Sequence, residues 1–239
     1  MGVDYHTAKW LKSELEHGRR AVENGRLLTL GRQNWWLTKK ESEKLGLNYA
    51  PEYSRTNYAD LFFTELGYTH ESLDISLSEG ADIKHDMSRP VDVILHGKYD
   101  VVLDLGTAEH VADQRQYWEN VYNLLAHKGT LIGLSPADGL CGHGLYQISP
   151  EFFQNLKGFT SKLWLTTYGP LVKTIPYTGV KGKPYRWRTY CRYILQKTGP
   201  FSMPVQKSSM VTTAYSTSIT FARFILAIPG IEILRRTFL

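Results

Sequence analysis

Three aspartates and two glycines stand at the ends of runs that are expected to be strands, and together they could form a binding site for a nucleoside. Asp74, Asp86 and Asp104 each close such a run, and Gly31 and Gly106 follow two of them. A carboxylate can accept hydrogen bonds from both hydroxyls of a ribose, a further carboxylate can bind an exocyclic amine, and glycine lets the backbone approach a ligand closely. Each acid could instead cap the turn or helix that follows it, as aspartate commonly does. Their order along the chain favours the shared nucleoside site.

The elements that must position these residues alternate between strand and helix patterns. Strands are predicted at residues 26–31, 71–76, 81–86, 99–106 and 129–136. Helices are predicted at residues 5–24, 38–46, 57–66, 113–126 and 150–156. The central strands are continuously apolar, which is typical of a parallel sheet covered by helices on both faces. Ligands of such sheets bind beyond the carboxyl ends of the strands, so the aspartates and glycines are predicted to meet there. Thr38 and Glu41 are expected to form a capping box at the start of the second helix.

The last third of the chain has a different pattern. Two further strands are predicted at residues 161–168 and 188–197, and an apolar segment at residues 219–228 follows a polar stretch. Residues 1–200 are expected to form one Rossmann-like α/β domain, and residues 201–239 a basic and apolar extension. The tail could cover a sheet edge, form a homodimer contact or lie on a membrane surface, and packing is the favoured interpretation.

The composition excludes several classes of protein. The 239 residues are 42% hydrophobic, which is enough for a core and unlike a disordered chain. Cys141 and Cys191 form neither a disulfide framework nor a CxxC motif. Because there is also no signal-peptide pattern and no apolar run of membrane-spanning length, we expect a reduced, cytoplasmic protein. The net charge is +5, and Glu232 is the only acidic residue after Glu151, so the last third is distinctly basic.

Three segments resemble class I S-adenosylmethionine-dependent methyltransferases. Residues 99–111 (YDVVLDLGTAEHV) resemble the fourth-strand motif of that class, especially the group with a Glu-His pair after the strand. Residues 124–132 (LLAHKGTLI) resemble the helix, glycine turn and fifth strand that follow. Residues 142–153 (GHGLYQISPEFF) resemble a segment of methyltransferase-like proteins from bacterial glycan and secondary-metabolite clusters. The resemblance covers residues 26–156. It implies a type 11-like methyltransferase that uses S-adenosylmethionine to methylate an oxygen or nitrogen of a small molecule or sugar.

The resemblance also assigns roles at the cofactor site. Asp74 would bind the ribose, and Asp86 would lie near the adenine. The sulfonium end would be lined by Leu105, Gly106 and Thr107.

The first loop departs from the pattern of the family. Gly31 marks the methionine side, where the family usually carries several glycines, as in GxGxG, but here the loop reads Gly31-Arg32-Gln33-Asn34-Trp35. Arg32 and Trp35 would crowd the methionine side unless the loop takes another route. A non-catalytic relative with a binding or scaffold role is therefore an alternative, and side chains that fill this pocket would support it.

The histidines are the candidates for catalysis. Methyl transfer from a sulfonium is an in-line displacement, and an oxygen acceptor often needs a base. His110 and His143 lie in loops expected at the ligand end of the sheet, and we predict that they face the acceptor as bases. Tyr146 could orient the acceptor, and Glu109 could fix the tautomer of either histidine. The alternative for His110 is a structural position at the start of a helix. A metal site of Asp104 and the two histidines is disfavoured, because no His-x-x-His or similar spacing exists.

The basic region between residues 181 and 193 interleaves charge with aromatic rings. Such a surface can hold single-stranded nucleic acid. The alternation also fits a strand with rings on one face and arginines on the other, and this plainer interpretation is favoured. An RNA-directed methyltransferase or an RNA-binding module stays as a second alternative.

Overall fold

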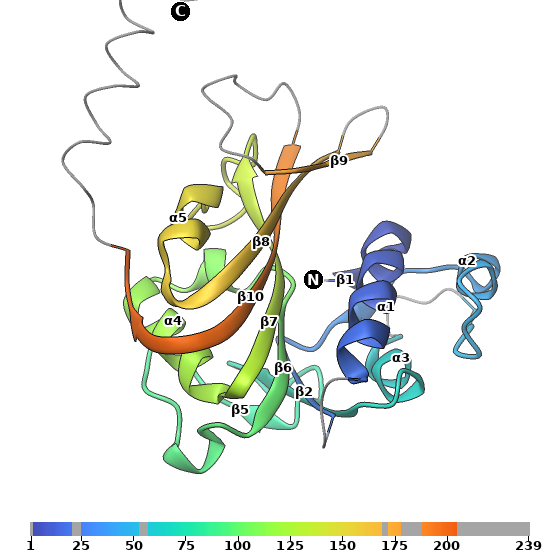
Figure 1. The fold of residues 1–239 in the computed structure, drawn as a ribbon. Helices are drawn as coiled ribbons and strands as arrows, with labels where there is room; N and C mark the ends of the chain where they lie inside the picture. The colour runs from blue at the N-terminus through green and yellow to red at the C-terminus, as the bar shows by residue number, and fades with distance from the viewer. Residues whose placement is uncertain (1, 21–24, 53–56, 169–171, 178–187, 205–239) are drawn as a thin grey trace, which may run out of the picture. The chain divides into compact units, whose positions relative to one another are not determined.

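The computed structural model describes residues 2–20, 25–52, 57–168, 172–177 and 188–204 (Figure 1). Nearly all of the predicted extension, with its apolar segment, and most of the basic aromatic segment lie outside these residues. The domain boundary, the roles of the tail and the RNA alternative therefore stay predictions. Within the described ranges, no helix combines the length and the apolar character needed to cross a membrane.

Eight strands of the described chain form one mixed sheet. They are β2 (Arg26–Leu30), β4 (Thr69–Asp74), β5 (Ile83–Lys84), β6 (Tyr99–Asp104), β7 (Leu125–Asp138), β8 (Lys157–Tyr168), β9 (Lys173–Pro176) and β10 (Arg188–Ser202). Their order across the sheet is β5-β4-β2-β6-β7-β10-β8-β9. The strands from β5 to β7 run parallel, whereas β10 is antiparallel to both of its neighbours. The predicted parallel sheet is confirmed, with an antiparallel extension at one side.

The order of the strands reverses between β2 and β6. From β2 the chain moves to β4 and β5 at one edge, and it then returns to β6 on the other side of β2. Leu30 at the end of β2 pairs with Leu73 of β4 and with Asp104 of β6, so the three strands end at the same level. A parallel sheet opens a crevice at the carboxyl ends of its strands where their order reverses. The topology therefore directs a ligand to the ends of β2, β4 and β6.

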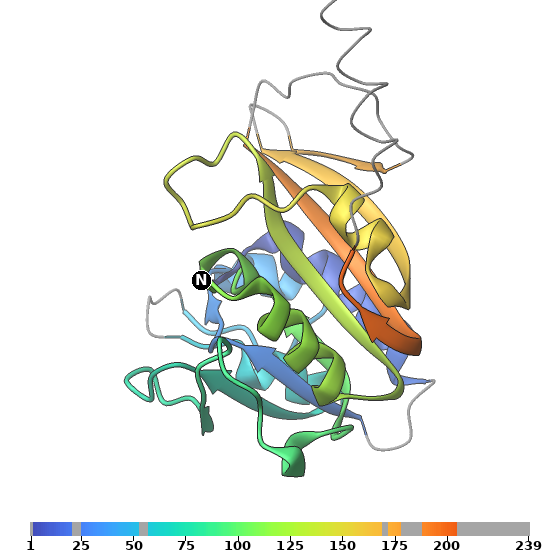
Figure 2. The same ribbon diagram turned by 90° about the vertical axis from the view of Figure 1, so that its left-hand side faces the viewer.

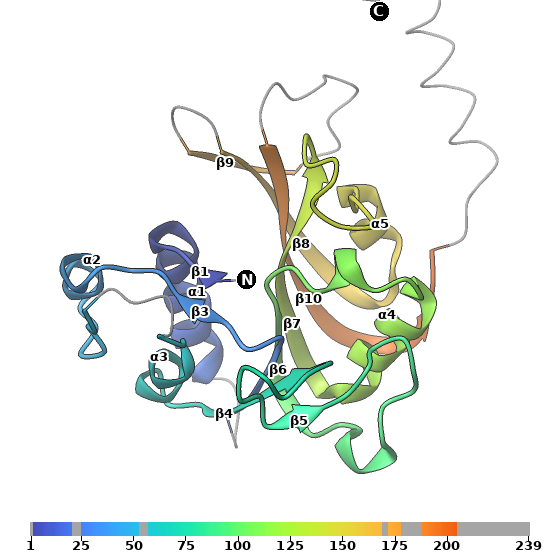
Figure 3. The same cartoon turned by 180° about the vertical axis from the view of Figure 1, so that it is seen from behind.

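Alternate residues of the central strands face two separate cores. Leu28 and Leu30 of β2 pack with α4 (Gln114–Leu124) and α5 (Pro150–Asn155). Leu27 packs on the other side, with α1 (Tyr5–Arg19) and α3 (Asp60–Glu65). Figures 1 and 3 show the two helix pairs on opposite sides of the sheet, and Figure 2 views the side that carries α4 and α5. Because both faces are covered, β2 and β6 are largely apolar, whereas β4 carries mostly polar residues. The predicted Rossmann-like α/β fold is confirmed.

Helix α2 (Lys39–Lys44) begins with the predicted capping box. Thr38 Oγ1 accepts a hydrogen bond from the amide of Glu41, and the Glu41 carboxylate accepts one from the amide of Thr38. Two other helices are shorter than predicted: α1 ends at Arg19, and α3 begins only at Asp60. Helix ends depend on tertiary packing more than on local sequence.

Three strands escaped prediction. The two-residue strands β1 (Gly2–Val3) and β3 (Asn34–Trp35) pair in parallel as a small separate sheet, and β9 adds an edge strand beside β8. Two residues cannot show the period-two alternation by which a strand is recognised. The β1–β3 pair matters for the site, because β3 lies in the loop that leaves β2.

Candidate functional site

A cleft of about 340 Å³ opens at the carboxyl ends of the parallel strands. Its walls come from residues 31–33 after β2, residues 73–75 and 79 in and after β4, residues 85–88 after β5, and residues 106, 107, 110 and 111 after β6. These segments surround the point where the strand order reverses. The cleft therefore lies where the topology alone would place a ligand.

Six of the residues predicted from the sequence line this cleft. They are Gly31, Asp74, Asp86, Gly106, Thr107 and His110. The side chain of Leu105 does not: it is 2% exposed and packs in the core beside α1 and α3. Glu109, His143 and Tyr146 are not among the lining residues and form a neighbouring cluster with His110. The acids and glycine turns predicted to meet at one rim of the sheet are thus together.

Each of the two cleft aspartates uses one oxygen to hold its own turn. Asp74 Oδ1 accepts a hydrogen bond from the amide of Ser76 at 3.1 Å, and Asp86 Oδ1 accepts one from the amide of Ser88 at 2.9 Å. The Ser88 hydrogen bond also lowers the pKa of Asp86. Asp74 Oδ2 faces Gly31 and is not engaged by any described residue. The turn-capping interpretation is therefore correct for one oxygen of each acid, and Asp74 keeps a second oxygen for a ligand.

The loop after β2 carries Trp35 away from the cleft and leaves Arg32 at the cleft wall. Trp35 lies in β3 and is fully buried in the core, with its ring centroid 5.0 Å from that of Phe62. Arg32 is one of the residues that line the cleft, and there its guanidinium stacks on Tyr58 and forms an ion pair with Asp60. Trp35 therefore does not fill the methionine side, whereas Arg32 stays at the cleft wall, and the non-catalytic relative remains an alternative.

Gln33 occupies the space at the end of β2, and sequence reasoning missed it. Its Nε2 donates hydrogen bonds to the carbonyl oxygens of Leu30 and Gly31, both at 3.1 Å. Its Oε1 is buried and has no hydrogen-bond partner within the described part of the chain. Gly31 has a φ of +78°, which a residue with a side chain rarely adopts. The one signal available in the sequence was a polar residue standing where the family carries glycine.

The turn after β6 is organised by the buried carboxylate of Asp104. Oδ1 accepts hydrogen bonds from the amides of Gly106 at 3.1 Å and Thr107 at 2.7 Å, and Oδ2 accepts one from the Tyr193 hydroxyl at 2.7 Å. Thr107 Oγ1 donates to the carbonyl oxygen of Leu30 at 2.8 Å, which ties this turn to β2. Burial, followed by the charge of Asp104, raises the pKa of Tyr193. Asp104 is thus a structural residue of the cleft wall.

Glu109, His110 and His143 come together beside the cleft. Glu109 is fully buried, and neither of its carboxylate oxygens has a hydrogen-bond partner among the described residues. Burial, and next the charge of Asp104, raise the pKa of Glu109 to about 8. His143 Nε2 lies 3.7 Å from Glu109 Oε1, too far for the hydrogen bond that would fix a tautomer. Burial, and next the nearby His143, lower the pKa of His110.

A glycine-rich loop holds His143 over Glu109. The amides of Leu145 and Tyr146 donate to the Glu109 carbonyl oxygen at 2.8 and 3.1 Å. Gly144 allows this approach, because a Cβ there would lie 2.9 Å from the same oxygen. The Tyr146 hydroxyl donates to the carbonyl oxygen of Ala112 at 2.9 Å, so it anchors the loop in this structure. Its predicted role in orienting an acceptor stays a prediction.

Comparison with known proteins identifies the fold. No protein-family model and no curated protein matches the sequence. A similar solved structure is the 1,6-didemethyltoxoflavin-N1-methyltransferase of Burkholderia thailandensis, crystallised with 1,6-didemethyltoxoflavin and S-adenosylhomocysteine. It has a TM-score of 0.50 and 15% identity, over 80% of this chain and 79% of that one. The CMeT domain of the citrinin polyketide synthase has a TM-score of 0.46 and 13% identity, over 82% and 52% of the two chains. The likeness to the first structure shows that this chain has the Rossmann-like fold of class I S-adenosylmethionine-dependent methyltransferases.

Proposed function

We propose that this protein is a methyltransferase that uses S-adenosylmethionine and acts on an oxygen or nitrogen of a small molecule or sugar. The observation that carries the proposal is the cleft at the reversal of the strand order, with Asp74, Asp86 and two glycine turns on its rim. Its volume of about 340 Å³ lies in the range of small-ligand sites. The structurally similar toxoflavin enzyme holds S-adenosylhomocysteine, which supports the same class of cofactor here.

The residues of the cleft fit this cofactor. Asp74 has a carboxylate oxygen without a partner among the described residues, which would bind the ribose hydroxyls, and Asp86, which lines the same cleft, would bind the adenine side. Gln33 Oε1 is a buried acceptor without a partner among the described residues, and it suits the ammonium group of the methionine part. Gly31 and Gly106, with φ of +78° and +112°, leave the backbone open to close approach. When bound, the cofactor supplies a methyl group on a positively charged sulfur.

The acceptor side of the site is formed by the histidine cluster. His110 lines the cleft, and the ring centroid of His143 lies 5.4 Å from that of His110. An imidazole at this position can take the proton that an acceptor hydroxyl or amine gives up during methyl transfer. The chain's main contribution to the reaction would be positioning, since an in-line displacement depends on the alignment of the reacting atoms.

Calorimetric titration with S-adenosylhomocysteine tests the proposal. We expect saturable binding to the wild-type protein and about 100-fold weaker binding to Asp74→Ala, because two hydrogen bonds to a carboxylate are lost. Glu43→Gln, which neutralises an exposed carboxylate on α2, is the matched control and should bind like wild type. No binding at millimolar concentration, or equal binding to Asp74→Ala, would refute the assignment of the cleft.

A further inference from the structure

Glu109, His110 and His143 offer three ligand atoms within 4.8 Å of one another. Glu109 and His110 belong to the short 3-10 helix Ala108–His110 after β6, and His143 comes from the glycine-rich loop after β7. Glu109 is buried, whereas both histidines are exposed. The cluster is therefore closed on the protein side and open on the solvent side. A metal site that also accepts an outside ligand has this form.

The carboxylate of Glu109 is the second, independent observation. It is 0% exposed, and no described residue gives either oxygen a hydrogen bond. A buried carboxylate without donors has lost its hydration, and nothing in its surroundings compensates for that loss. Protonation would not satisfy the group, since the resulting O–H would itself lack an acceptor. A cation held between this carboxylate and the histidines would satisfy it.

We infer that Glu109, His110 and His143 bind a divalent transition-metal ion. Two imidazoles and one carboxylate suit zinc, iron, cobalt or nickel, whereas magnesium and calcium prefer sets made of oxygen alone. Asp104 was the carboxylate of the metal site that the sequence disfavoured. The structure excludes that choice, because both oxygens of Asp104 already accept hydrogen bonds from Tyr193 and from two amides. Glu109 takes its place, which no sequence spacing indicates.

The loop contacts support the placement of the third ligand. Two amides after His143 bind the Glu109 carbonyl oxygen, and Gly144 permits the contact. The loop is thus docked on the same residue whose carboxylate lacks a partner. Metal–nitrogen and metal–oxygen bonds are about 2 Å long. The three ligand atoms would therefore each have to move by about 1 Å to coordinate one ion. Such a movement is open to exposed histidine side chains.

The position of the ion suggests its use, and this part rests on the proposed function. His110 also lines the proposed cofactor cleft, so an ion held by this cluster would lie beside the cleft, where an acceptor could reach it. A metal-held acceptor hydroxyl loses its proton to water more readily. Its oxygen then forms a bond to the methyl carbon as the carbon–sulfur bond breaks, and the electron pair stays on sulfur. In that case the histidines serve as ligands and not as bases.

Titration with ZnCl2 and with CoCl2 tests metal binding directly. Calorimetry should give one Zn²⁺ per chain, and Co²⁺ should develop the visible absorption of a protein-bound ion. Binding should weaken at least about 100-fold in His143→Ala and in Glu109→Gln, since even indirect partners of a metal ligand contribute 10–100-fold. His127→Ala removes an exposed histidine elsewhere and should bind like wild type. A Cys141→Ser background removes the exposed thiol as a competing ligand.

Two results would overturn the inference. One is the absence of stoichiometric Zn²⁺ or Co²⁺ binding by the wild-type protein. The other is equal binding by His143→Ala, a substitution on an exposed loop that should leave the fold intact. Titration of the same samples with S-adenosylhomocysteine separates the two proposals. If S-adenosylhomocysteine binds and Zn²⁺ does not, only the metal site is refuted. If Zn²⁺ binds and S-adenosylhomocysteine does not, only the assignment of the cleft is refuted.

Discussion

Replacing Tyr193 by phenylalanine should destabilise the protein by removing one hydrogen bond inside the sheet. Tyr193 lies on β10, is fully buried, and donates its hydroxyl to Asp104 Oδ2 at 2.7 Å. Its ring stacks on Phe153 with the centroids 4.2 Å apart. The ring also covers Gly133, where an added Cβ would lie 2.1 Å from it. Phenylalanine keeps both ring contacts, so the substitution isolates the contribution of the hydroxyl.

The size of the effect follows from the burial of Asp104. This carboxylate is 0% exposed, and its other oxygen is engaged by the amides of Gly106 and Thr107. Water cannot replace the lost hydroxyl without opening the core. A hydrogen bond to a charged group contributes about 1.5–3 kcal/mol, and the unsatisfied oxygen makes the upper part of that range apply. We therefore expect Y193F to lower the free energy of unfolding by about 2–3 kcal/mol.

Urea unfolding followed by tryptophan fluorescence measures this difference. Tyr122→Phe is the matched control, because the Tyr122 hydroxyl donates to the neutral carbonyl oxygen of Gly199 at 2.9 Å in a partly buried position. Its loss should cost about 0.5–1.5 kcal/mol. Both variants should unfold with the wild-type m value, which reports an unchanged folded surface. If Y193F cost no more than Y122F, the argument that Asp104 organises the turn as a buried anion would be wrong.

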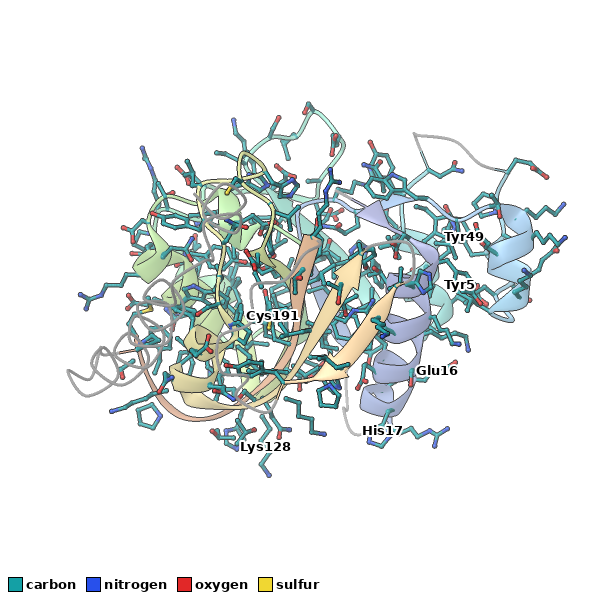
Figure 4. All side chains as sticks on the ribbon, turned by 90° about the horizontal axis from the view of Figure 1, so that it is seen from above. Tyr5, Glu16, His17, Tyr49, Lys128 and Cys191 are labelled. Carbon is teal, nitrogen blue, oxygen red and sulfur yellow. The ribbon has the colours of Figure 1, made fainter. Side chains whose placement is uncertain are left out.

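Three further predictions concern acid stability, the loop over Glu109 and the thiols. Burial lowers the pKa of His70, so the unfolded chain takes up a proton first as the pH falls. As the pH drops under 6.5, the free energy of unfolding should therefore decrease by up to about 1.4 kcal/mol per pH unit. In urea titrations at several pH values, His70→Gln should show a smaller decrease per pH unit. Gly144→Ala should displace the loop and speed its proteolysis, whereas Gly199→Ala, which adds a Cβ in open space, should not. One native thiol, Cys141, should react with a thiol reagent; Cys191 is buried among the strands (Figure 4), and burial raises its pKa.

The parallel part of the fold could be predicted because its strands are covered on both sides. Residues 99–106 (YDVVLDLG) are apolar apart from Asp100 and Asp104 and end in glycine, and β6 occupies Tyr99–Asp104. Two-sided burial leaves this pattern in the sequence itself. The insertion of β10 between β7 and β8 leaves no such pattern. Which strand lies beside which is decided by packing between distant segments, and local periodicity carries no information about it.

The positions of site residues could be predicted from the sequence only where the parallel direction of the strands determines them. Asp74 and Gly106 follow parallel strands, and such ends must meet at one edge of the sheet. The position of Gln33 depends on the pairing of β3 with β1, two short segments far apart in the sequence. Likewise, the exclusion of Asp104 as a metal ligand depends on Tyr193, a residue of the last described strand. These contacts exist only after the whole sheet has formed.

The turn after β6 explains how adjacent residues serve two different surfaces. Asp104 closes the turn, and residues 108–110 continue it as a 3-10 helix. With three residues per turn, consecutive side chains point about 120° apart. Glu109 therefore points into the protein beneath the loop, whereas His110 points into the cleft. A cation shared by these two neighbours would connect the buried carboxylate to the ligand side of the sheet, so any change that loosens the Asp104 turn should weaken cofactor binding and metal binding together.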